Sequence, residues 1–168
     1  TRANEIMTGK RNTKSPVHPN DHVNKCQSSN DVIPSTIHIA ARRSIDEALL
    51  PALANLMERL DEKAKAFSDI EKIGRTHLQD AVVMTLGNEF AGYFGQIKNA
   101  GQRLEGPRER LSMLALGGTA VGTGLNAHPE FAKNVISRIA KETGIPFSEA
   151  PNHFEAQGAC DAAVETSG

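Results

Sequence analysis

The chain has 168 residues, which is enough for one domain with a hydrophobic core. Its 19 basic and 20 acidic side chains nearly cancel, so net charge gives no reason to expect nucleic acid or an anionic membrane as a partner. It contains no apolar run of about 18 residues, which excludes a membrane span, and its two cysteines match no disulfide framework, as expected of a cytoplasmic protein.

The first 31 residues are polar and rich in turn-forming residues, and they end in HPNDHVNKCQSSND. A long apolar periodicity follows directly, so Ser28, Ser29 and Asn30 stand where a helix should begin. Two interpretations are open. Asn30 or Asp31 caps the helix, or the neutral donors and the positive helix end together form a site for a carboxylate or phosphate.

The longest predicted helix covers residues 33–67, where apolar residues recur every three or four positions. Pro34 fits the first turn, whereas Pro51 should kink the helix without ending it. Such a helix would be about 52 Å long at about 1.5 Å per residue, and a compact chain of this length is roughly 40 Å across. We therefore expect its apolar stripe to be buried in a bundle shared between subunits.

Three further helices are predicted, and the fold class is all-α. One runs from about residue 85 to 116 with an interruption near Gly106-Pro107, one from Phe131 to Gly144, and one from about Asn152 to the end. No alternating strand pattern of useful length occurs, although residues 82–84 could be a short extended piece.

Two polar segments connect these helices. GRTHLQDA, residues 74–81, contains His77, which is either an ordinary surface histidine or a catalytic group on a connection. GGTAVGTGLN, residues 117–126, lacks the lysine of a phosphate-binding loop and any preceding strand, so its glycines favour close backbone packing or a tight turn. His18 and His22 have helical spacing, but Pro19 and Asn20 argue against a helix, and no metal site is predicted.

In this order and at these separations, HPNDHVNKCQSSND, GRTHLQDA and GGTAVGTGLN resemble the segments of class II fumarases, in the fumarase/aspartase superfamily. The tail APNHFEAQGACDAAVETSG is similar as well. The resemblance implies a lyase that interconverts fumarate and (S)-malate in the tricarboxylic acid cycle, without metal or organic cofactor. It also implies a homotetramer whose active sites each draw on three subunits, in the cytoplasm or the mitochondrial matrix.

The resemblance assigns roles to individual residues. His77 corresponds to the catalytic proton donor and acceptor. The substrate-binding residues correspond to Ser28, Ser29, Asn30 and Thr76. A second dicarboxylate site near the entrance corresponds to His18, Pro19, Asn20 and Asp21.

The resemblance also defines what this sequence lacks. The family takes the carbon proton with a serine on a GSSxMPxKxN loop, and no such string occurs. We therefore expect residues 1–168 to be an inactive central fragment of a longer protein: residues 1–31 ending an N-terminal domain, residues 32–168 forming part of the central helical bundle. An aspartate ammonia-lyase on the same scaffold and a non-catalytic helical assembly protein remain alternatives; Gly117-Gly118-Thr119 and APNHFEA favour the fumarase.

Overall fold

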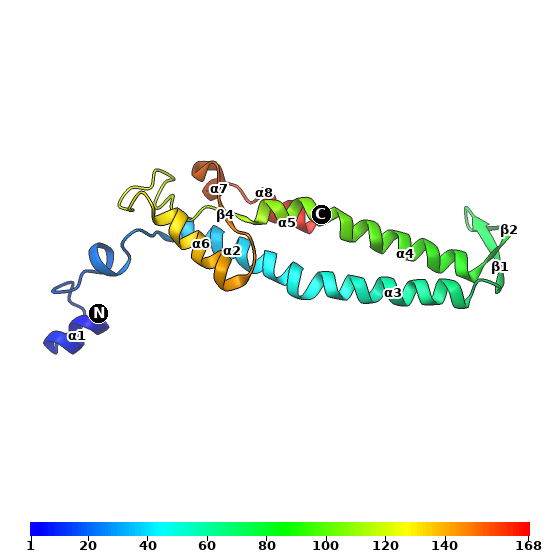
Figure 1. The fold of residues 1–168 in the computed structure, drawn as a ribbon, viewed down its shortest axis with the longest axis horizontal. Coiled ribbons are helices and arrows are strands. Elements are labelled where there is room, and N and C mark those ends of the chain that lie inside the picture. The colour runs from blue at the N-terminus through cyan, green and yellow to red at the C-terminus, as the bar shows by residue number, and fades with distance from the viewer. The chain divides into compact units, whose positions relative to one another are not determined.

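The computed structural model describes all of residues 1–168 and divides them into two compact units. Unit 1 comprises Thr1–Ala41 and Arg110–Gly168, and unit 2 comprises Arg42–Glu109. The secondary structure is predominantly helical, which confirms the predicted all-α class (Figure 1). No helix is both long and apolar enough to cross a lipid bilayer. The predicted boundary between residues 31 and 32 stays a prediction.

The elements of the chain follow one another in the order α1 (Arg2–Thr8), π-helical turn η1 (Pro19–Val23), α2 (Ser29–Ser44), π-helical turn η2 (Ile45–Leu49), α3 (Leu50–Ala66), β1 (Glu71–Thr76), β2 (Gln79–Thr85), α4 (Leu86–Arg103), α5 (Glu105–Leu111), β3 (Met113–Leu114), α6 (Phe131–Thr143), β4 (Ser148–Glu149), α7 (His153–Gly158) and α8 (Asp161–Ser167).

Unit 2 is a pair of long helices, α3 and α4, that run side by side and are joined by the β1–β2 hairpin (Figure 1). Where the two helices meet the hairpin, the rings of Phe67 and Phe90 pack edge to face with centroids 5.3 Å apart. Gly87 allows this approach, because a β-carbon there would lie 2.5 Å from the carbonyl oxygen of Ala64.

The helical conformation continues through Pro51, as predicted. Its ring would clash with the carbonyl group of Glu47 in a regular helix, and it has no N–H to donate. The structure accommodates it with η2, a wider turn in which the N–H of Leu50 donates to the carbonyl oxygen of Ile45. The disturbance expected at the proline therefore takes the form of a π-helical turn directly before it.

The β1–β2 hairpin was missed by the sequence prediction, which placed only residues 82–84 in an extended piece. The strands pair antiparallel from Glu71 opposite Thr85 to Thr76 opposite Gln79. The less exposed positions of β1 are Lys72 and Gly74, which are not apolar, so no alternation of hydropathy marks the strand. Its two-residue turn also lacks the Asn-Gly type of sequence that signals a hairpin.

Unit 1 contains the hydrophobic core. Leu114, Leu116, Ile136, Ile145 and Phe147 are buried together, and apolar side chains of α2 and α6 pack against them. The short strands β3 and β4 pair in parallel beside this core. The prediction for α6 is confirmed, including its end at Gly144, which has the left-handed conformation (φ 71°) typical of a glycine that closes a helix.

The last predicted helix begins where expected but does not run to the end of the chain. Asn152 caps α7 by accepting hydrogen bonds from the N–H groups of Phe154 and Glu155. The helix stops at Gly158, a residue of low helix propensity, and the extended Ala159 separates it from α8.

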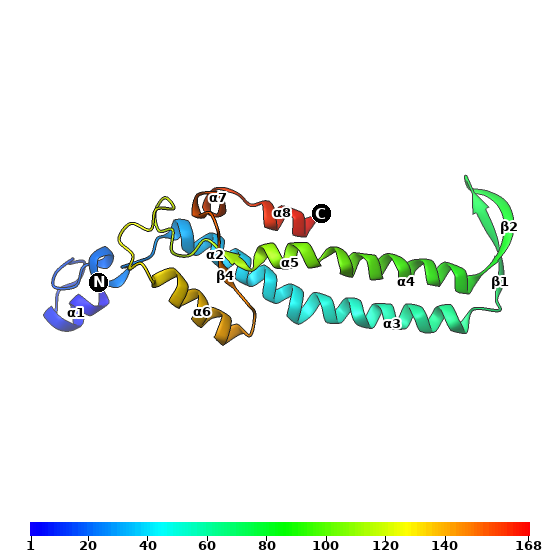
Figure 2. The ribbon, with the colours of Figure 1, turned by 45° about the horizontal axis from the view of Figure 1, so that its top comes forward.

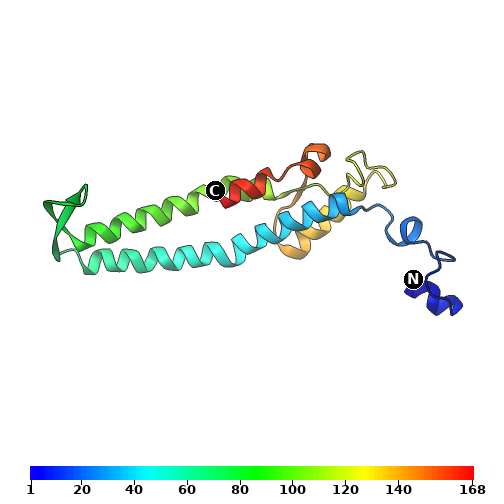
Figure 3. The same cartoon turned by 180° about the vertical axis from the view of Figure 1, so that it is seen from behind.

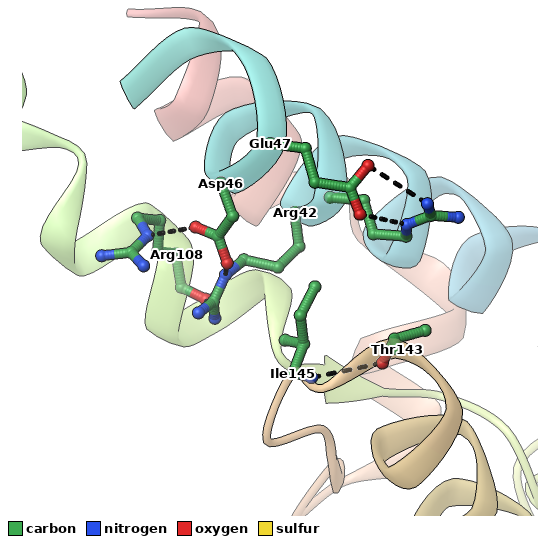
Figure 4. A network of polar contacts seen from close by, with 7 residues as sticks. Arg42, Asp46, Glu47, Arg108, Thr143 and Ile145 are labelled. Carbon is green, nitrogen blue, oxygen red and sulfur yellow. Dashed lines mark hydrogen bonds and ion pairs between the residues drawn. The ribbon is translucent and has the colours of Figure 1, made fainter. Parts of the chain in front are cut away.

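An ion-pair network fixes the beginning of unit 2 (Figure 4). Asp46 accepts hydrogen bonds from Nε of Arg42 and Nε of Arg108, both at 2.7 Å, and Arg42 also donates to the carbonyl oxygen of Arg108 at 2.8 Å. Partial burial would raise the pKa of Asp46, but the hydrogen bonds from Arg108 and Arg42 outweigh it, and the pKa lies below its ordinary value of 3.8. Arg42 itself is 8% exposed.

We predict that Asp46→Asn lowers the free energy of unfolding by about 3 kcal/mol at pH 7, because it leaves the buried guanidinium of Arg42 without its counter-charge. Because the folded-state pKa of Asp46 is lowered, this contribution is fully present well above the ordinary pKa of 3.8 and is lost progressively as the pH falls from there through the folded-state pKa. Urea unfolding of the complete protein at pH 7 and at about pH 2.5 measures both effects. Equal losses at the two pH values would contradict the assignment.

Candidate functional site

The segment Ser28–Asn30 forms the beginning of α2. The first helical hydrogen bond runs from the N–H of Val32 to the carbonyl oxygen of Ser28, and the Ser28 hydroxyl accepts from the N–H of Asn30 at 3.2 Å. Ser28 is therefore the capping residue, and the prediction that Asn30 or Asp31 has this role is wrong. Asp31 instead accepts from the N–H of Ser28, which is one of the two hydrogen bonds of a capping box.

An open hollow of about 500 Å³ lies beside this helix start and is lined by Asn20, Asn24, Gln27, Ser28, Ser29, Val32 and Ile33. It brings together residues of the two predicted sites, because Asn20 belongs to the segment 18–21 and the serines to the segment 28–30. Ser29 is exposed at its rim. The hollow therefore presents side-chain hydroxyl and amide groups beside the N-terminal end of a long helix.

The segment around His18 corrects another expectation. Pro19–Val23 form the π-helical turn η1, so a helical turn is present where the proline argued against one. The proline occupies the first position of the turn, where its missing N–H is not needed. The N–H of Asp21 donates to Nδ1 of His18 at 3.2 Å, and the N–H of His18 donates to Nδ1 of His22 at 2.8 Å.

The glycine-rich segment 117–126 packs against the beginning of α2 (Figure 2). The side-chain amide of Asn30 donates to the carbonyl oxygen of Ala120 at 2.7 Å. Gly117 has a φ of 107°, and a β-carbon there would lie 2.4 Å from that of Ala132. The prediction that these glycines serve close packing is confirmed.

Thr76 and His77 lie at the turn of the β1–β2 hairpin, beyond the ends of α3 and α4 in unit 2 (Figure 3). His77 and Leu78 form a two-residue turn with positive φ angles of 48° and 62°. Next to the turn, Arg75 and Asp80 form an ion pair across the strands at 3.1 Å. His77 is exposed and makes no hydrogen bond within the chain.

The base of the hairpin is attached to α4 by charged groups. Lys72 of β1 pairs with Glu89 of α4, which also accepts a hydrogen bond from the Tyr93 hydroxyl at 3.0 Å. The hydrogen bond from Lys72, followed by that from Tyr93, lowers the pKa of Glu89. These contacts hold the strands that carry His77 on the helix pair.

The structure therefore places the predicted residues in two groups. Ser28–Asn30 and the segment 18–21 belong to unit 1, and Thr76 and His77 belong to unit 2. Their roles in substrate binding and catalysis stay predictions. Nowhere do three His, Cys, Asp or Glu side chains come together as a metal site would require.

Sequence reasoning missed three residues that hold the site's backbone. Asp31 is fully buried, and its carboxylate accepts from the N–H groups of Gly117 and Thr119, both at 3.0 Å. Gln157 donates to the carbonyl oxygen of Thr119, and His153 bonds that of Ala115. The Ser-x-x-Asp spacing could have indicated the hydrogen bond from the N–H of Ser28 to Asp31, but no local pattern indicates partners 86 and 88 positions away.

Comparisons with known proteins give matches along the whole chain. The profile of a protein family described as Lyase matches residues 1–168. The chain is 56% identical, over 96% of its length, to the class II fumarate hydratase of Methylorubrum extorquens, and 55% identical, over 99%, to the mitochondrial fumarate hydratase of Homo sapiens. These matches cover 34% and 33% of the two relatives, so the chain spans about a third of their length.

A solved structure supports the same relationship. The class II fumarase of Schistosoma mansoni superposes with a TM-score of 0.85 at 35% sequence identity, covering 99% of this chain and 38% of that one. The helical pair, the hairpin and the glycine-rich segment are therefore features of a fold already known among lyases.

Proposed function

Because this chain belongs to the lyase family whose profile spans all of its residues, we propose that it is part of a class II fumarate hydratase. The proposed reaction adds water to fumarate: a hydroxyl group joins one carbon of the double bond and a proton joins the other, giving (S)-malate. The strongest support is the identity of 55–56% to two fumarate hydratases along almost the whole chain. We also propose that the protein lies in the cytoplasm or the mitochondrial matrix; one relative is bacterial and another is named as mitochondrial.

Ser28, Ser29 and Asn30 are proposed to bind a substrate carboxylate. When malate loses a proton beside this carboxylate, a second negative charge develops on it, and fixed donors stabilise the charge as it grows. Hydroxyl and amide groups at a helix N-terminus provide donors and a favourable dipole without a competing counter-ion. The hollow beside the beginning of α2 supports this role. Because Asn20 also lines it, we propose that His18, Pro19, Asn20 and Asp21 form a second dicarboxylate site near the entrance.

His77 is proposed to exchange a proton with the hydroxyl group that leaves malate or joins fumarate, with Thr76 binding the substrate beside it. Histidine is suited to this step because its ordinary pKa is about 6.5. The exposed position of His77 at a hairpin turn, with no partner inside the chain, leaves its ring available to a substrate. The proton on carbon is proposed to go to a serine outside residues 1–168.

The complete site is proposed to form in a homotetramer, where three copies contribute to each active site. Ser28–Asn30 of one copy would then meet His77 of another. Exposed apolar side chains on α2 and α3 support such packing: Ile33, Ile37 and Leu56 are 55%, 48% and 44% exposed.

We predict that His77→Ala in the complete protein lowers kcat for fumarate hydration by about 10²–10⁴-fold, the range for one general acid–base group. Steady-state kinetics monitored by the loss of fumarate absorbance measures the effect. The control is His128→Ala, which removes another exposed histidine, on the segment before α6. Near-normal turnover of His77→Ala would refute the proposed role.

A product assay shows whether the complete protein adds water or ammonia to fumarate. We expect the complete protein to convert fumarate to malate at the same rate with and without ammonium ions, because the proposed site activates water. Chromatographic separation of malate and aspartate identifies the product. Aspartate that forms only when ammonium is present would replace the proposed reaction with that of an ammonia-lyase, and no product under either condition would favour a non-catalytic assembly protein.

A further inference from the structure

The carboxylate of Asp31 is fully buried and is held by backbone N–H groups alone. Oδ1 accepts from Ser28, and Oδ2 accepts from Gly117 and from Thr119, each at 3.0 Å. No lysine, arginine or histidine pairs with it. A buried carboxylate needs such donors, and three directed N–H groups fix its position.

These three hydrogen bonds join two segments that are distant in sequence. Oδ1 accepts from the N–H of Ser28 and so orients the peptide group that precedes this residue. Oδ2 accepts from the N–H groups of both Gly117 and Thr119. The positive φ angles of these two residues, 107° and 57°, allow their N–H groups to converge on one oxygen. Asp31 therefore couples the backbone of Ser28–Asn30 to the glycine-rich segment.

The glycine-rich segment is in turn attached to α7. Gln157 donates to the carbonyl oxygen of Thr119 at 2.7 Å, and Nδ1 of His153 lies 2.8 Å from the carbonyl oxygen of Ala115. A β-carbon on Gly118 would come within 3.0 Å of both side chains. Ser28–Asn30 is thus connected to α7 by contacts that pass through Asp31, and Asn30 is also joined to the same segment by its own hydrogen bond to Ala120.

We propose that Asp31 is a positioning residue for the dicarboxylate substrate: it holds the donors of Ser28–Asn30 in the arrangement that a substrate carboxylate needs. This inference rests on the proposed function, because it takes those residues as the carboxylate site. Hydrogen bonds are directional, so donors displaced by even a fraction of an ångström bind the carboxylate less tightly. Asp31 makes no contact with the substrate itself.

The test is Asp31→Asn in the complete protein. An amide retains the size of the side chain but directs an NH2 group toward at least one of the N–H donors, so the coupling is lost. We expect KM for fumarate and the inhibition constant of succinate, an unreactive dicarboxylate, to rise together by about tenfold or more, while kcat changes less. The control is Asp46→Asn, which also removes a carboxylate but in unit 2, and which should leave both constants unchanged.

A double-mutant cycle separates positioning from general damage. If Asp31 acts through Asn30, the variant with both Asp31→Asn and Asn30→Ala should bind succinate no more weakly than the weaker of the single variants. Effects that multiply would show that the two residues act independently and would overturn the inference. So would unchanged constants in a folded Asp31→Asn protein.

Gln157→Leu provides a milder second variant if Asp31→Asn does not fold, because it removes only the hydrogen bond to Thr119 at a partly buried position. We expect a roughly threefold to fivefold rise in both constants; no change would overturn the inference. Titration calorimetry with succinate keeps the two proposals apart. A wild-type protein that binds succinate but does not hydrate fumarate would refute the proposed function alone, whereas one that does not bind succinate would refute the inference too.

Discussion

A carboxylate that is removed from water must be surrounded by hydrogen-bond donors, and at Asp31 the chain supplies them from its own backbone. This requirement organises the part of unit 1 around the beginning of α2. The donors converge only if the glycine-rich segment turns back onto the beginning of α2, and that turn needs the left-handed conformation of Gly117 and Thr119. Gly117 therefore serves the carboxylate of the protein itself. Ser28 and Ser29 line the open hollow, whereas the side-chain amide of Asn30 donates to the carbonyl oxygen of Ala120.

Unit 2 holds one short turn at the end of a long helix pair. The α3–α4 pair carries the hairpin, and three features keep the hairpin in place: the aromatic contact of Phe67 with Phe90, the close approach at Gly87, and the pairing of Lys72 with Glu89. At the other end of the pair, Asp46 joins Arg42 and Arg108. The helix pair is thus fastened at both ends by contacts within unit 2.

The long helices could be predicted from the sequence because their signals are local. The short α1 was not predicted, and the helix predicted for residues 85–116 is interrupted at Leu104 and ends at Leu111. Apolar spacing located α3, α4 and α6, and Gly144 marked a helix end that the structure reproduces. The hairpin could not be predicted, because its strands place Lys72 and Gly74 on the less exposed side and its turn is His-Leu. The candidate site was identified only in part: a run such as Ser28–Asn30 is visible in the sequence, but the hydrogen bonds of Asp31 join residues more than 80 positions apart.

The turn at His77 and Leu78 connects these observations to the proposed chemistry. Two consecutive side-chain-bearing residues with positive φ each cost energy, and such strain persists only where the surrounding structure enforces it. Here the paired strands on either side enforce it, aided by the Arg75–Asp80 ion pair. In this conformation the imidazole ring of His77 is exposed and Leu78 is 92% exposed. The leucine side chain is not buried within its own chain. Under the proposed function, the histidine meets a substrate and the leucine meets a neighbouring copy of the chain, which would place catalysis in the assembly and not in the single chain.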